Sequence, residues 1–593
     1  MTTAAPGGDL AFSNGNVVEV RPSGPLFRRY GHSRRTHPST FLRTLRPRDW
    51  AVVVGIAAGW LVAFAAFWLW WWRPEHRAGW PGLVTASVLM LYLTGLPGHH
   101  LRAVLRMRHV NPAIEALRLR IAFLVTRAAT EPWPMARRTL KAMLDQRISQ
   151  PYDVWLCDES PSPEILRWCG RNGVRVSSRR GVPDYHRDGW PRRAGCKEGN
   201  LAYFYDHWGY RDYDVVAQLD CDHVPYPTYL AAVVRPFADP AIGYVAAPDV
   251  CDANTTNSWV ARGRLHREAP RQGPVQLGHN QDCAPLAAGS HHAVRTRALR
   301  DIGGPGPERV EAVATTFLLS SAGWRGAYAV EAEAHGDGPL TVTDMAVQEF
   351  QRARDRTGLL LTLAPAHLGR FGTGLRLRFA VLLGQHPLLV ALAVALLAGP
   401  ALAALTGRPW VDVDGRELAV HLLAVALWLP PLRLYLRHVG LLRPAYAPVL
   451  SWEAVLYALV RWPWVAAGVL SAAVRAPRTG RVTVTPKYRT GREPLPVRLV
   501  APYLAITVLL ATAALVGELK TGATGSALLC LLGAAAYGAA GLAVPLLYIA
   551  EAARARRVRF ADALDTARTP LLLGAFALLL PLAAALAALV ALA

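Results

Sequence analysis

Two acidic residues one position apart form the most chemically suggestive motif in the chain. They stand in Asp220-Cys221-Asp222, directly after an apolar run that begins at Val215. Residues i and i+2 of an extended segment point the same way, so the two carboxylates repel each other unless a cation lies between them. Magnesium is usually bound by one or two carboxylates together with phosphate oxygens. The motif therefore predicts that Asp220 and Asp222 hold a divalent cation and a diphosphate; the alternative is a surface turn with two solvated acids.

Two further motifs carry side chains that suit a nucleotide or a phosphate. Asp158 follows the apolar segment Val154–Leu156, where its carboxylate could accept a hydrogen bond from a nucleobase or ribose, or instead cap a helix. The motif Lys197-x-Gly-Asn200 precedes a helix-like stretch. Lys197 could meet a phosphate or a carboxylate, and Asn200 could cap the helix that follows.

The segment from about residue 118 to residue 356 has the pattern of an α/β domain that would position these motifs. Short apolar runs typical of buried strands alternate with helical stretches such as Pro134–Gln146, which favours a mostly parallel sheet with helices on both faces. Open sheets of this kind bind ligands at the carboxyl ends of their strands. The predicted strands are Ile121–Val125, Val154–Leu156, Val174–Val176, Val215–Leu219 and Gly243–Ala246.

The composition of the 593-residue chain indicates a membrane protein. Hydrophobic residues make up 52% and charged residues only 18%, which is too apolar for a purely soluble enzyme. The net charge of +23 fits either nucleic acid or an anionic membrane surface, and the long apolar runs decide for the lipid bilayer. The seven cysteines contain no Cys-x-x-Cys pair, so neither a disulfide framework nor a zinc site is indicated. We expect no nucleic-acid partner.

Seven apolar runs are each long enough to cross ~30 Å of hydrocarbon. The segment before them is polar and basic without a leading apolar core, so we expect it to be cytosolic and not a cleaved signal peptide. Because two crossings return the chain to its starting side, the α/β domain is expected in the cytosol too. The predicted crossings are Trp50–Trp72, Pro81–Leu101, His386–Leu405, Leu418–Leu436, Val497–Val516, Ala527–Ile549 and Pro570–Leu592.

Two other apolar segments, Gly358–Leu383 and Ser451–Val474, are predicted to be helices lying in the membrane interface. Both are interrupted by arginine, proline or glycine. The arginine-rich loop 475–498 should be cytosolic, and an extra crossing at Ser451–Val474 would put that loop outside. An ordinary eighth crossing at Ser451–Val474 remains the alternative.

Three motifs together resemble the processive family 2 glycosyltransferases, most closely the catalytic subunit of bacterial cellulose synthase. That family carries Lys-x-Gly-Asn shortly before Asp-x-Asp-His-x-Pro, and here Lys197-x-Gly-Asn200 precedes Asp220-x-Asp222-His223-x-Pro225. The third match, in Val-Thr-Val-Thr-Pro-Lys, is similar to the family's gating loop Phe-x-Val-Thr-x-Lys. Its residues here are Thr483, Thr485 and Lys487.

The resemblance implies a UDP-sugar as donor, with its diphosphate on Mg²⁺ or Mn²⁺ held by Asp220 and Asp222. Asp158 would hold the nucleotide. Lys197, together with the positions of a Gln-x-x-Arg-Trp motif, Gln351 and Arg354, would meet the diphosphate. A growing β-glycan would act as acceptor and pass outward through the membrane helices.

The sequence departs from the family pattern on the acceptor side. The family's Thr-Glu-Asp base motif falls on Val310-Glu311-Ala312, which leaves Glu311 as the candidate base, with Thr343-Asp344 as a second candidate. The tryptophan that stacks on the acceptor is replaced by Asp355. The Phe-Phe-Cys-Gly-Ser acceptor motif survives only as Leu-Ala-Ala-Gly-Ser at residues 286–290.

The sequence thus predicts a GT-A-like α/β glycosyltransferase domain inserted in a polytopic protein of the bacterial inner membrane. It would be a hexosyltransferase that extends and translocates a β-glycan, with other polysaccharide-export subunits as candidate partners. Two alternatives are a catalytically impaired subunit that binds nucleotide sugar without turnover, and a transferase that adds one sugar to a lipid-linked acceptor. The predicted parts are 1–48 basic segment, 49–107 two crossings, 118–357 transferase domain, 358–474 interface helices with two crossings, 475–496 gating-loop segment and 497–593 three crossings.

Overall fold

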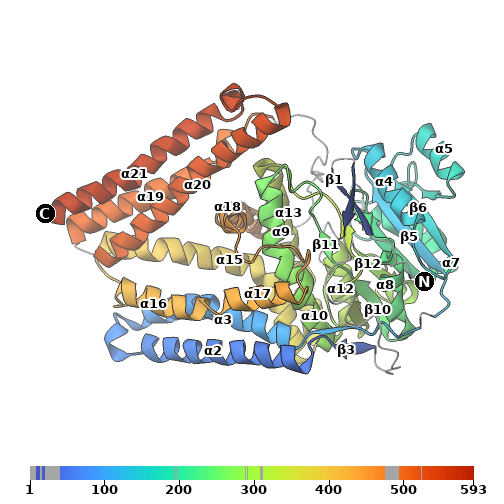
Figure 1. Ribbon diagram of the computed structural model, residues 1–593, viewed down its shortest axis with the longest axis horizontal. Helices are drawn as coiled ribbons and strands as arrows, with labels where there is room; N and C mark the ends of the chain where they lie inside the picture. Colours follow the sequence, from blue (N-terminus) through green and yellow to red (C-terminus); the bar gives the residue numbers. More distant parts are fainter. Residues whose placement is uncertain are drawn as a thin grey trace, which may run out of the picture.

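The computed structural model has an α/β part and a part made of long helices, which lie at opposite ends of the molecule (Figure 1). The N-terminal strands β1 (Asp9–Ser13) and β2 (Asn16–Val20) form a hairpin, and β3 (Phe41–Arg43) pairs with β4 (Arg108–Val110). The structure describes residues 9–13, 16–20, 40–115, 117–192, 194, 197–287, 289, 291–307, 311–474, 493–521 and 524–592.

A seven-stranded mixed sheet forms the centre of the α/β part. The pairs β5–β6, β5–β8, β6–β7 and β10–β13 are parallel, whereas β12 runs antiparallel between β8 and β10. The five predicted strands are all present, and the mostly parallel sheet is confirmed. In spatial order the strands are β13 (Arg325–Tyr328), β10 (Ile242–Ala246), β12 (His292–Arg295), β8 (Val215–Asp220), β5 (Ile121–Arg127), β6 (Tyr152–Asp158) and β7 (Arg175–Ser177).

Helices cover both faces of this sheet, which is why its strands are apolar along almost their whole length. Successive strand residues alternate between the faces. In β8, Val215, Ala217 and Leu219 pack on the face covered by α4 (Trp133–Leu144), α5 (Pro163–Arg171) and α8 (Tyr229–Val234). Val216 packs on the opposite face, which is covered by α6 (Lys197–Phe204), α11 (Thr296–Asp301) and α12 (Glu311–Ser321).

A small three-stranded sheet continues the chain beyond the carboxyl end of β8. Its order is β11 (Asp249–Val250), β14 (Ala334–His335) and β9 (Val224–Pro225). Asp249 pairs with Ala334, and His335 pairs with Val224. This sheet therefore brings Asp249 beside the residues that directly follow Asp222.

Eight helices within the described residues are long and apolar enough to cross a bilayer, which confirms the polytopic architecture. Each of the seven predicted crossings falls in one of them. Helices α16 and α17 together make one span. The helices are α2 (Pro47–Trp71), α3 (Trp80–Leu105), α15 (Thr373–Thr406), α16 (Gly415–Ala426) with α17 (Leu429–His438), α18 (Trp452–Val474), α19 (Ala501–Val516), α20 (Thr524–Arg556) and α21 (Arg568–Leu592).

Helix α18 is the eighth of these and covers the segment predicted to lie in the membrane interface. Figure 1 shows α18 almost end-on, whereas α2, α3 and α16 run along the page. It therefore runs across the direction of those helices, as a helix in the plane of the membrane would. The interface assignment of Ser451–Val474 stays a prediction.

The other predicted interface helix, Gly358–Leu383, is not one helix. α13 (Val342–Thr362) ends within it, two short turns follow, and α15 begins at Thr373. Pro365 explains the break, because proline lacks the N–H that would continue α13 and disfavours helical backbone in the residue before it. The expected boundary at residue 357 also lies inside α13.

Helix α9 (Trp259–Pro270) joins the α/β part to the long helices. Ser258 caps its N-terminus by accepting from the Ala261 N–H, and the Trp259 N–H donates to Glu551 of α20 at 2.5 Å. At its other end α9 passes into a π-helical turn, Arg271–Val275. Such turns occur often at functional sites.

Candidate active site

Asp220 ends strand β8 and faces the start of α6. Its Oδ1 lies 2.9 Å from the Nζ of Lys197, the first residue of that helix. The Asp220 side chain is about a third exposed, at 37%. The next residue, Cys221, is fully buried in the apolar core on the other side of the sheet. The alternation of the strand thus places Gln218 and Asp220 on the α6 face, as the sequence pattern requires.

Asp222 is joined to Asp249 through a histidine. The Nδ1 of His223 lies 3.0 Å from Asp222 Oδ1, and its Nε2 lies 3.2 Å from Asp249 Oδ1. Burial alone would lower the pKa of His223, but the charge and hydrogen bond of Asp222, with the hydrogen bond of Asp249, raise it well above the ordinary value. Burial alone would raise the pKa of Asp249, but the hydrogen bond from His223 and nearby cations hold it well below. A charged imidazole therefore links two carboxylates.

The residues at Asp220 and Asp222 fit a hard divalent cation. Both offer oxygen ligands, and the sulfur of Cys221 between them points into the core. Lys197 and His223 compensate part of the negative charge and orient the carboxylates. Cys251 also lies near His223 and Asp249, and these three could form a softer metal site. Their hydrogen bonds to one another already account for the geometry.

The motif Lys197-x-Gly-Asn200 fixes α6 against the sheet edge. Asn200 lies inside the helix and donates from Nδ2 to the Cys157 carbonyl at 3.0 Å. The expectation that Asn200 caps the helix is therefore wrong. This contact ties α6 to the carboxyl end of β6.

Asp158 ends β6, two strands away from Asp220 at the same edge of the sheet. Its carboxylate is fully buried, lies 2.9 Å from Arg127 Nη1 and accepts from the Ser160 N–H. The structure thus places Asp158 where a nucleotide was predicted to bind and already gives it a structural ion pair. Its contact with a nucleotide stays a prediction.

Glu311 begins α12 and points toward the sheet. It accepts from Gln218 Nε2 and from Thr315 Oγ1, each at 3.1 Å, and His292 Nε2 lies 3.8 Å away. Gln218 precedes Asp220 by two residues on the same face of β8, so Glu311 lies on the side of the sheet that carries Asp220. Ala312 is packed in an apolar cluster. The role of Glu311 as base stays a prediction.

Asp344, the second candidate base, has a structural role. It forms a capping box with Thr341 at the start of α13: Thr341 Oγ1 accepts from the Asp344 N–H, and Asp344 Oδ2 accepts from the Thr341 N–H. Further along the helix, Arg354 pairs with its neighbour Asp355 at 3.1 Å. That pair occupies the positions at which a diphosphate ligand and a stacking tryptophan were expected.

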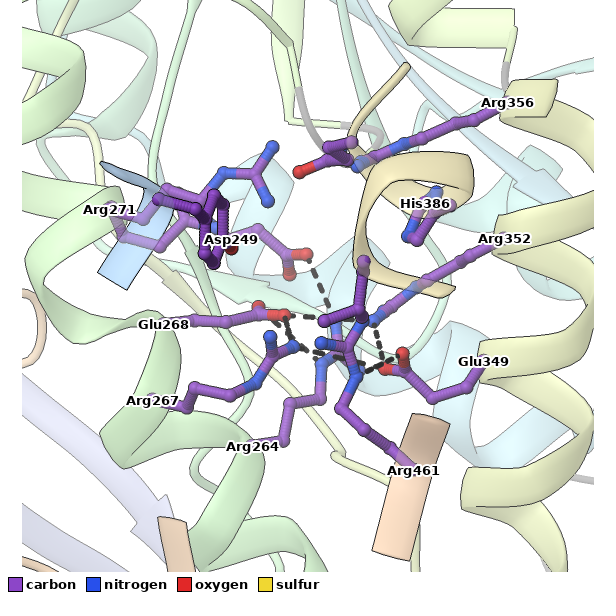
Figure 2. A pocket seen from close by; sticks show the side chains of 14 residues that line it. Asp249, Arg264, Arg267, Glu268, Arg271, Glu349, Arg352, Arg356, His386 and Arg461 are labelled. Atoms are coloured by element: carbon purple, nitrogen blue, oxygen red, sulfur yellow. Dashed lines mark hydrogen bonds and ion pairs between the residues drawn. The ribbon is translucent and has the colours of Figure 1, made fainter. Parts of the chain in front are cut away.

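A pocket of about 190 Å³ lies on the far side of Asp249 from Asp222, and Figure 2 shows its charged side chains converging from several helices. Gln351 and Arg354 are absent from its lining; the α13 residues that line it are Glu349, Arg352 and Arg356. We call this site the arginine pocket. Its lining is Tyr92, Asp249, Arg264, Arg267, Glu268, Arg271, Gln272, Glu349, Arg352, Arg356, Gln385, His386, Leu389 and Arg461.

Sequence reasoning missed the arginine pocket, although a signal was present. Arg264, Arg267 and Arg271 are spaced i, i+3, i+7, as are Glu349, Arg352 and Arg356. That spacing puts each trio on one face of a helix. The sequence could not show that the two faces meet, because α9 and α13 are far apart in the chain.

Two predicted segments fall partly or wholly outside the described residues. Thr483, Thr485 and Lys487 of the gating loop lie in the undescribed range 475–492. In the acceptor segment, Gly289 lies so close to Asp249 that a Cβ there would come within 2.8 Å of Asp249 Oδ2. Gly289 therefore packs against Asp249, and a larger residue there would require the Asp249 side chain to shift.

The comparison with protein families agrees with the α/β part. Residues 120–358 match the model of the family described as "Glycosyltransferase like family 2". The matched residues cover the seven-stranded sheet and its helices, and this part of the chain has the predicted GT-A-like α/β fold. No curated protein matches the chain.

Several solved glycosyltransferase structures are similar at low identity. The mannosyltransferase PcManGT from Pyrobaculum calidifontis, in complex with GDP-Man and Mn²⁺, is 17% identical, with 66% of this chain and 98% of that chain covered and a TM-score of 0.40. Glucosyl-3-phosphoglycerate synthase from Mycobacterium tuberculosis, in complex with Mn²⁺, UDP and glucosyl-3-phosphoglycerate, is 17% identical, with 37% and 72% covered and a TM-score of 0.25. TarS from S. aureus is 12% identical, with 39% of each chain covered and a TM-score of 0.24.

Proposed function

We propose that this protein is a membrane-embedded hexosyltransferase that transfers a sugar from a UDP-sugar with the help of Mg²⁺ or Mn²⁺. The observation that carries the proposal is the arrangement at the carboxyl end of β8. Asp220 is paired with Lys197, and Asp222 is joined to Asp249 through His223. These residues lie in a domain that matches a glycosyltransferase family.

The chain's own residues would bind and orient the donor. A divalent cation at Asp220 and Asp222 would supply positive charge to the departing diphosphate. Lys197 Nζ, 2.9 Å from Asp220, would add a second positive charge near the same oxygens. His223 holds Asp222 by a 3.0 Å contact, so the carboxylate keeps its orientation as charge develops.

On the acceptor side, Glu311 is the proposed general base. Deprotonation of an acceptor hydroxyl by a placed carboxylate contributes a factor of roughly 10²–10⁴. From the resemblance to cellulose synthase we propose that the acceptor is a growing β-glycan, which passes outward through the long helices. The membrane would be the bacterial inner membrane, with the α/β domain in the cytosol and export subunits as partners.

The second candidate is a catalytically impaired relative that binds nucleotide sugar without turnover. It is favoured by one observation: Ala312, packed in an apolar cluster, occupies the expected base position. In this case Glu311 would serve only to hold Gln218 and Thr315 in place.

One experiment separates the candidates. The full chain is purified in detergent and given UDP-glucose, UDP-galactose or UDP-N-acetylglucosamine with Mn²⁺ or Mg²⁺, and both UDP release and polymer are measured. Polymer supports the processive transferase. UDP release without polymer supports single transfer, and metal-dependent UDP binding without release supports the impaired relative. Absence of UDP binding with both Mn²⁺ and Mg²⁺ would refute the processive transferase, the single-transfer enzyme and the impaired relative alike.

A further inference from the structure

The arginine pocket holds more positive than negative charge. Six of its lining side chains are arginines, whereas only three are carboxylates, namely Asp249, Glu268 and Glu349. Four arginines share these carboxylates through contacts of 2.7 to 3.9 Å: Arg264, Arg267, Arg352 and Arg461. No ion pair in the described part of the chain reaches the other two, Arg271 and Arg356.

Of the two arginines without an ion pair, Arg356 is the more buried. Its side chain is buried, with only 7% of the residue exposed, and its Nε has no hydrogen-bond acceptor. Burial, with Arg271 and Arg352 acting in the same direction, lowers the pKa of Arg356 to about 9. The group is therefore still protonated at pH 7. A buried cation without a partner is costly, so such groups are normally paired.

Most of the buried polar side-chain atoms of the lining that lack partners are N–H donors, and the remaining one is the ring nitrogen Nδ1 of His386. Four buried side-chain N–H groups of the lining have no acceptor: the Nε atoms of Arg264, Arg267 and Arg356, and Gln385 Nε2. A ligand that only accepts hydrogen bonds would satisfy all of them. Phosphate oxygens have this character and pair well with guanidinium groups.

The walls of the pocket come from two different environments. Arg264, Arg267 and Arg271 come from α9 and the turn after it, in the α/β part. Tyr92 lies on α3 and Leu389 on α15, both of which are among the helices that can cross a bilayer. A ligand in this pocket therefore lies between the α/β part and helices that can cross a bilayer.

The pocket also borders the candidate active site. Arg264 Nη2 lies 3.5 Å from Asp249 Oδ2, and the other oxygen of Asp249 lies 3.2 Å from His223. His223 in turn contacts Asp222. One carboxylate and one imidazole thus separate the arginines from the proposed metal ligand.

We propose that the arginine pocket binds the phosphate or diphosphate group of an amphipathic lipid that serves as acceptor for the transferred sugar. The proposal rests on the transferase function proposed above and assigns it a lipid-linked acceptor in place of the growing β-glycan. The bond formed would join the donor's anomeric carbon to an acceptor oxygen, the bond broken would join that carbon to the UDP oxygen, and UDP leaves with the electron pair. The acceptor proton, where the acceptor is a hydroxyl, passes to the general base.

The test is a binding measurement on the full chain in detergent, which needs no turnover. Farnesyl phosphate is the probe, with farnesol and inorganic phosphate as the two halves of the same ligand. The wild type should bind farnesyl phosphate at least about tenfold more tightly than either half. Arg356→Gln and Arg271→Gln should each weaken that binding by about tenfold or more, because a charge-assisted hydrogen bond is lost. Arg211→Gln, which removes an exposed arginine far from the pocket, should leave it unchanged.

Three results would overturn the proposal. Equal affinity for inorganic phosphate would assign the pocket to a free anion. Unchanged farnesyl phosphate binding in both pocket variants would place the lipid elsewhere. Weaker binding of UDP with Mn²⁺, but not of farnesyl phosphate, in the same variants would assign the arginines to the donor. Failure of the transferase proposal looks different: UDP and metal would fail to bind while farnesyl phosphate still does.

Thermal unfolding of the ligand-free protein tests whether Arg356 has only a structural role. Arg356 is a buried cation without an ion pair. Arg356→Gln should therefore raise the melting temperature of the ligand-free protein and weaken the binding of farnesyl phosphate. A fall in melting temperature together with weaker binding would mean that Arg356 holds the fold together, and would contradict the proposal.

Discussion

Asp249 separates two charged regions that are balanced in different ways. On one side, the three acids at the proposed metal site each have a cation beside them: Asp220 has Lys197, and Asp222 and Asp249 share His223. On the other side, the arginine pocket leaves Arg271 and Arg356 without an ion pair in the described part of the chain. The first region is held in shape by its own residues. In the second, the positive charges of Arg271 and Arg356 favour the binding of an anion.

We therefore expect the two regions to respond in opposite ways to mutation. Changes among the carboxylates should impair metal binding or chemistry and leave lipid phosphate binding intact. Changes among the unpaired arginines should impair lipid phosphate binding and leave the metal in place.

Glu311→Gln should have the largest effect on transfer. The amide keeps the size of the side chain but cannot take a proton, so kcat should fall by roughly 10²–10⁴ with little change in UDP affinity. The assay is UDP release under saturating donor. Glu164→Gln, at the exposed start of α5, is the matched control. Nearly full activity in Glu311→Gln would place the base elsewhere or support the impaired relative.

Arg443→Gln should destabilise the protein, in contrast to Arg356→Gln. Arg443 Nε lies 2.8 Å from Glu333 Oε1, and both side chains are almost completely buried. Losing Arg443 removes the nearer cation from the buried Glu333 carboxylate, which keeps His335 at 3.6 Å, and breaking a buried ion pair typically costs about 3–5 kcal/mol. Thermal unfolding in detergent checks this, and if both arginine variants shifted the melting temperature in the same direction, the contrast between paired and unpaired arginines would be lost.

Asp222→Asn should weaken Mn²⁺ binding by about 10–100-fold or more, because it removes a proposed ligand and the charge that His223 balances. A Mn²⁺ titration of UDP binding measures the effect. Asp212→Asn, on a partly exposed acid paired with Arg211, is the control. If the Mn²⁺ dependence of UDP binding were unchanged, Asp222 would not be a metal ligand.

The smallest effect is expected from alkaline pH acting on His335, in the sheet that carries Asp249. Burial alone would lower its pKa, but the charge and hydrogen bond of Asp252, with help from Glu333, raise it to about 10. The raised value means that protonated His335 stabilises the fold fully below about pH 6.5, and that this contribution is lost as pH rises through about 10. The melting temperature of the wild type should therefore exceed that of His335→Gln by a few degrees at pH 7, and the gap should shrink toward pH 10. A gap that grows with pH would contradict the assignment.

Much of the fold followed from local pattern. The runs at β5, β6 and β8 are short, apolar and followed by polar motifs, so both the strands and the edge with Asp158 and Asp220 could be predicted. β12 was missed because His292-Ala-Val-Arg295 has polar residues at both ends and only two apolar residues between them. Its antiparallel place between β8 and β10 depends on tertiary packing that no local pattern records.

The candidate site was only partly predictable for the same reason. Lys197 and Asp220 could be named from the sequence and meet in the structure. On α13 the motif alignment chose Gln351 and Arg354, whereas the structure turns Arg352 into the pocket and brings Gln348 within 3.5 Å of Arg264. A shift of one or two residues along a helix rotates a side chain to another face, so motif spacing alone could not decide which arginine faces the ligand.

The contact between Trp259 and Glu551 has a practical consequence. The first N–H of the arginine-bearing helix is satisfied by a carboxylate that belongs to the C-terminal group of helices, almost three hundred positions later in the chain. Excising the catalytic domain for biochemistry would strip that helix of an acceptor and of a favourable charge at its amino end. Experiments on the proposed lipid site therefore need the C-terminal helices together with the α/β domain.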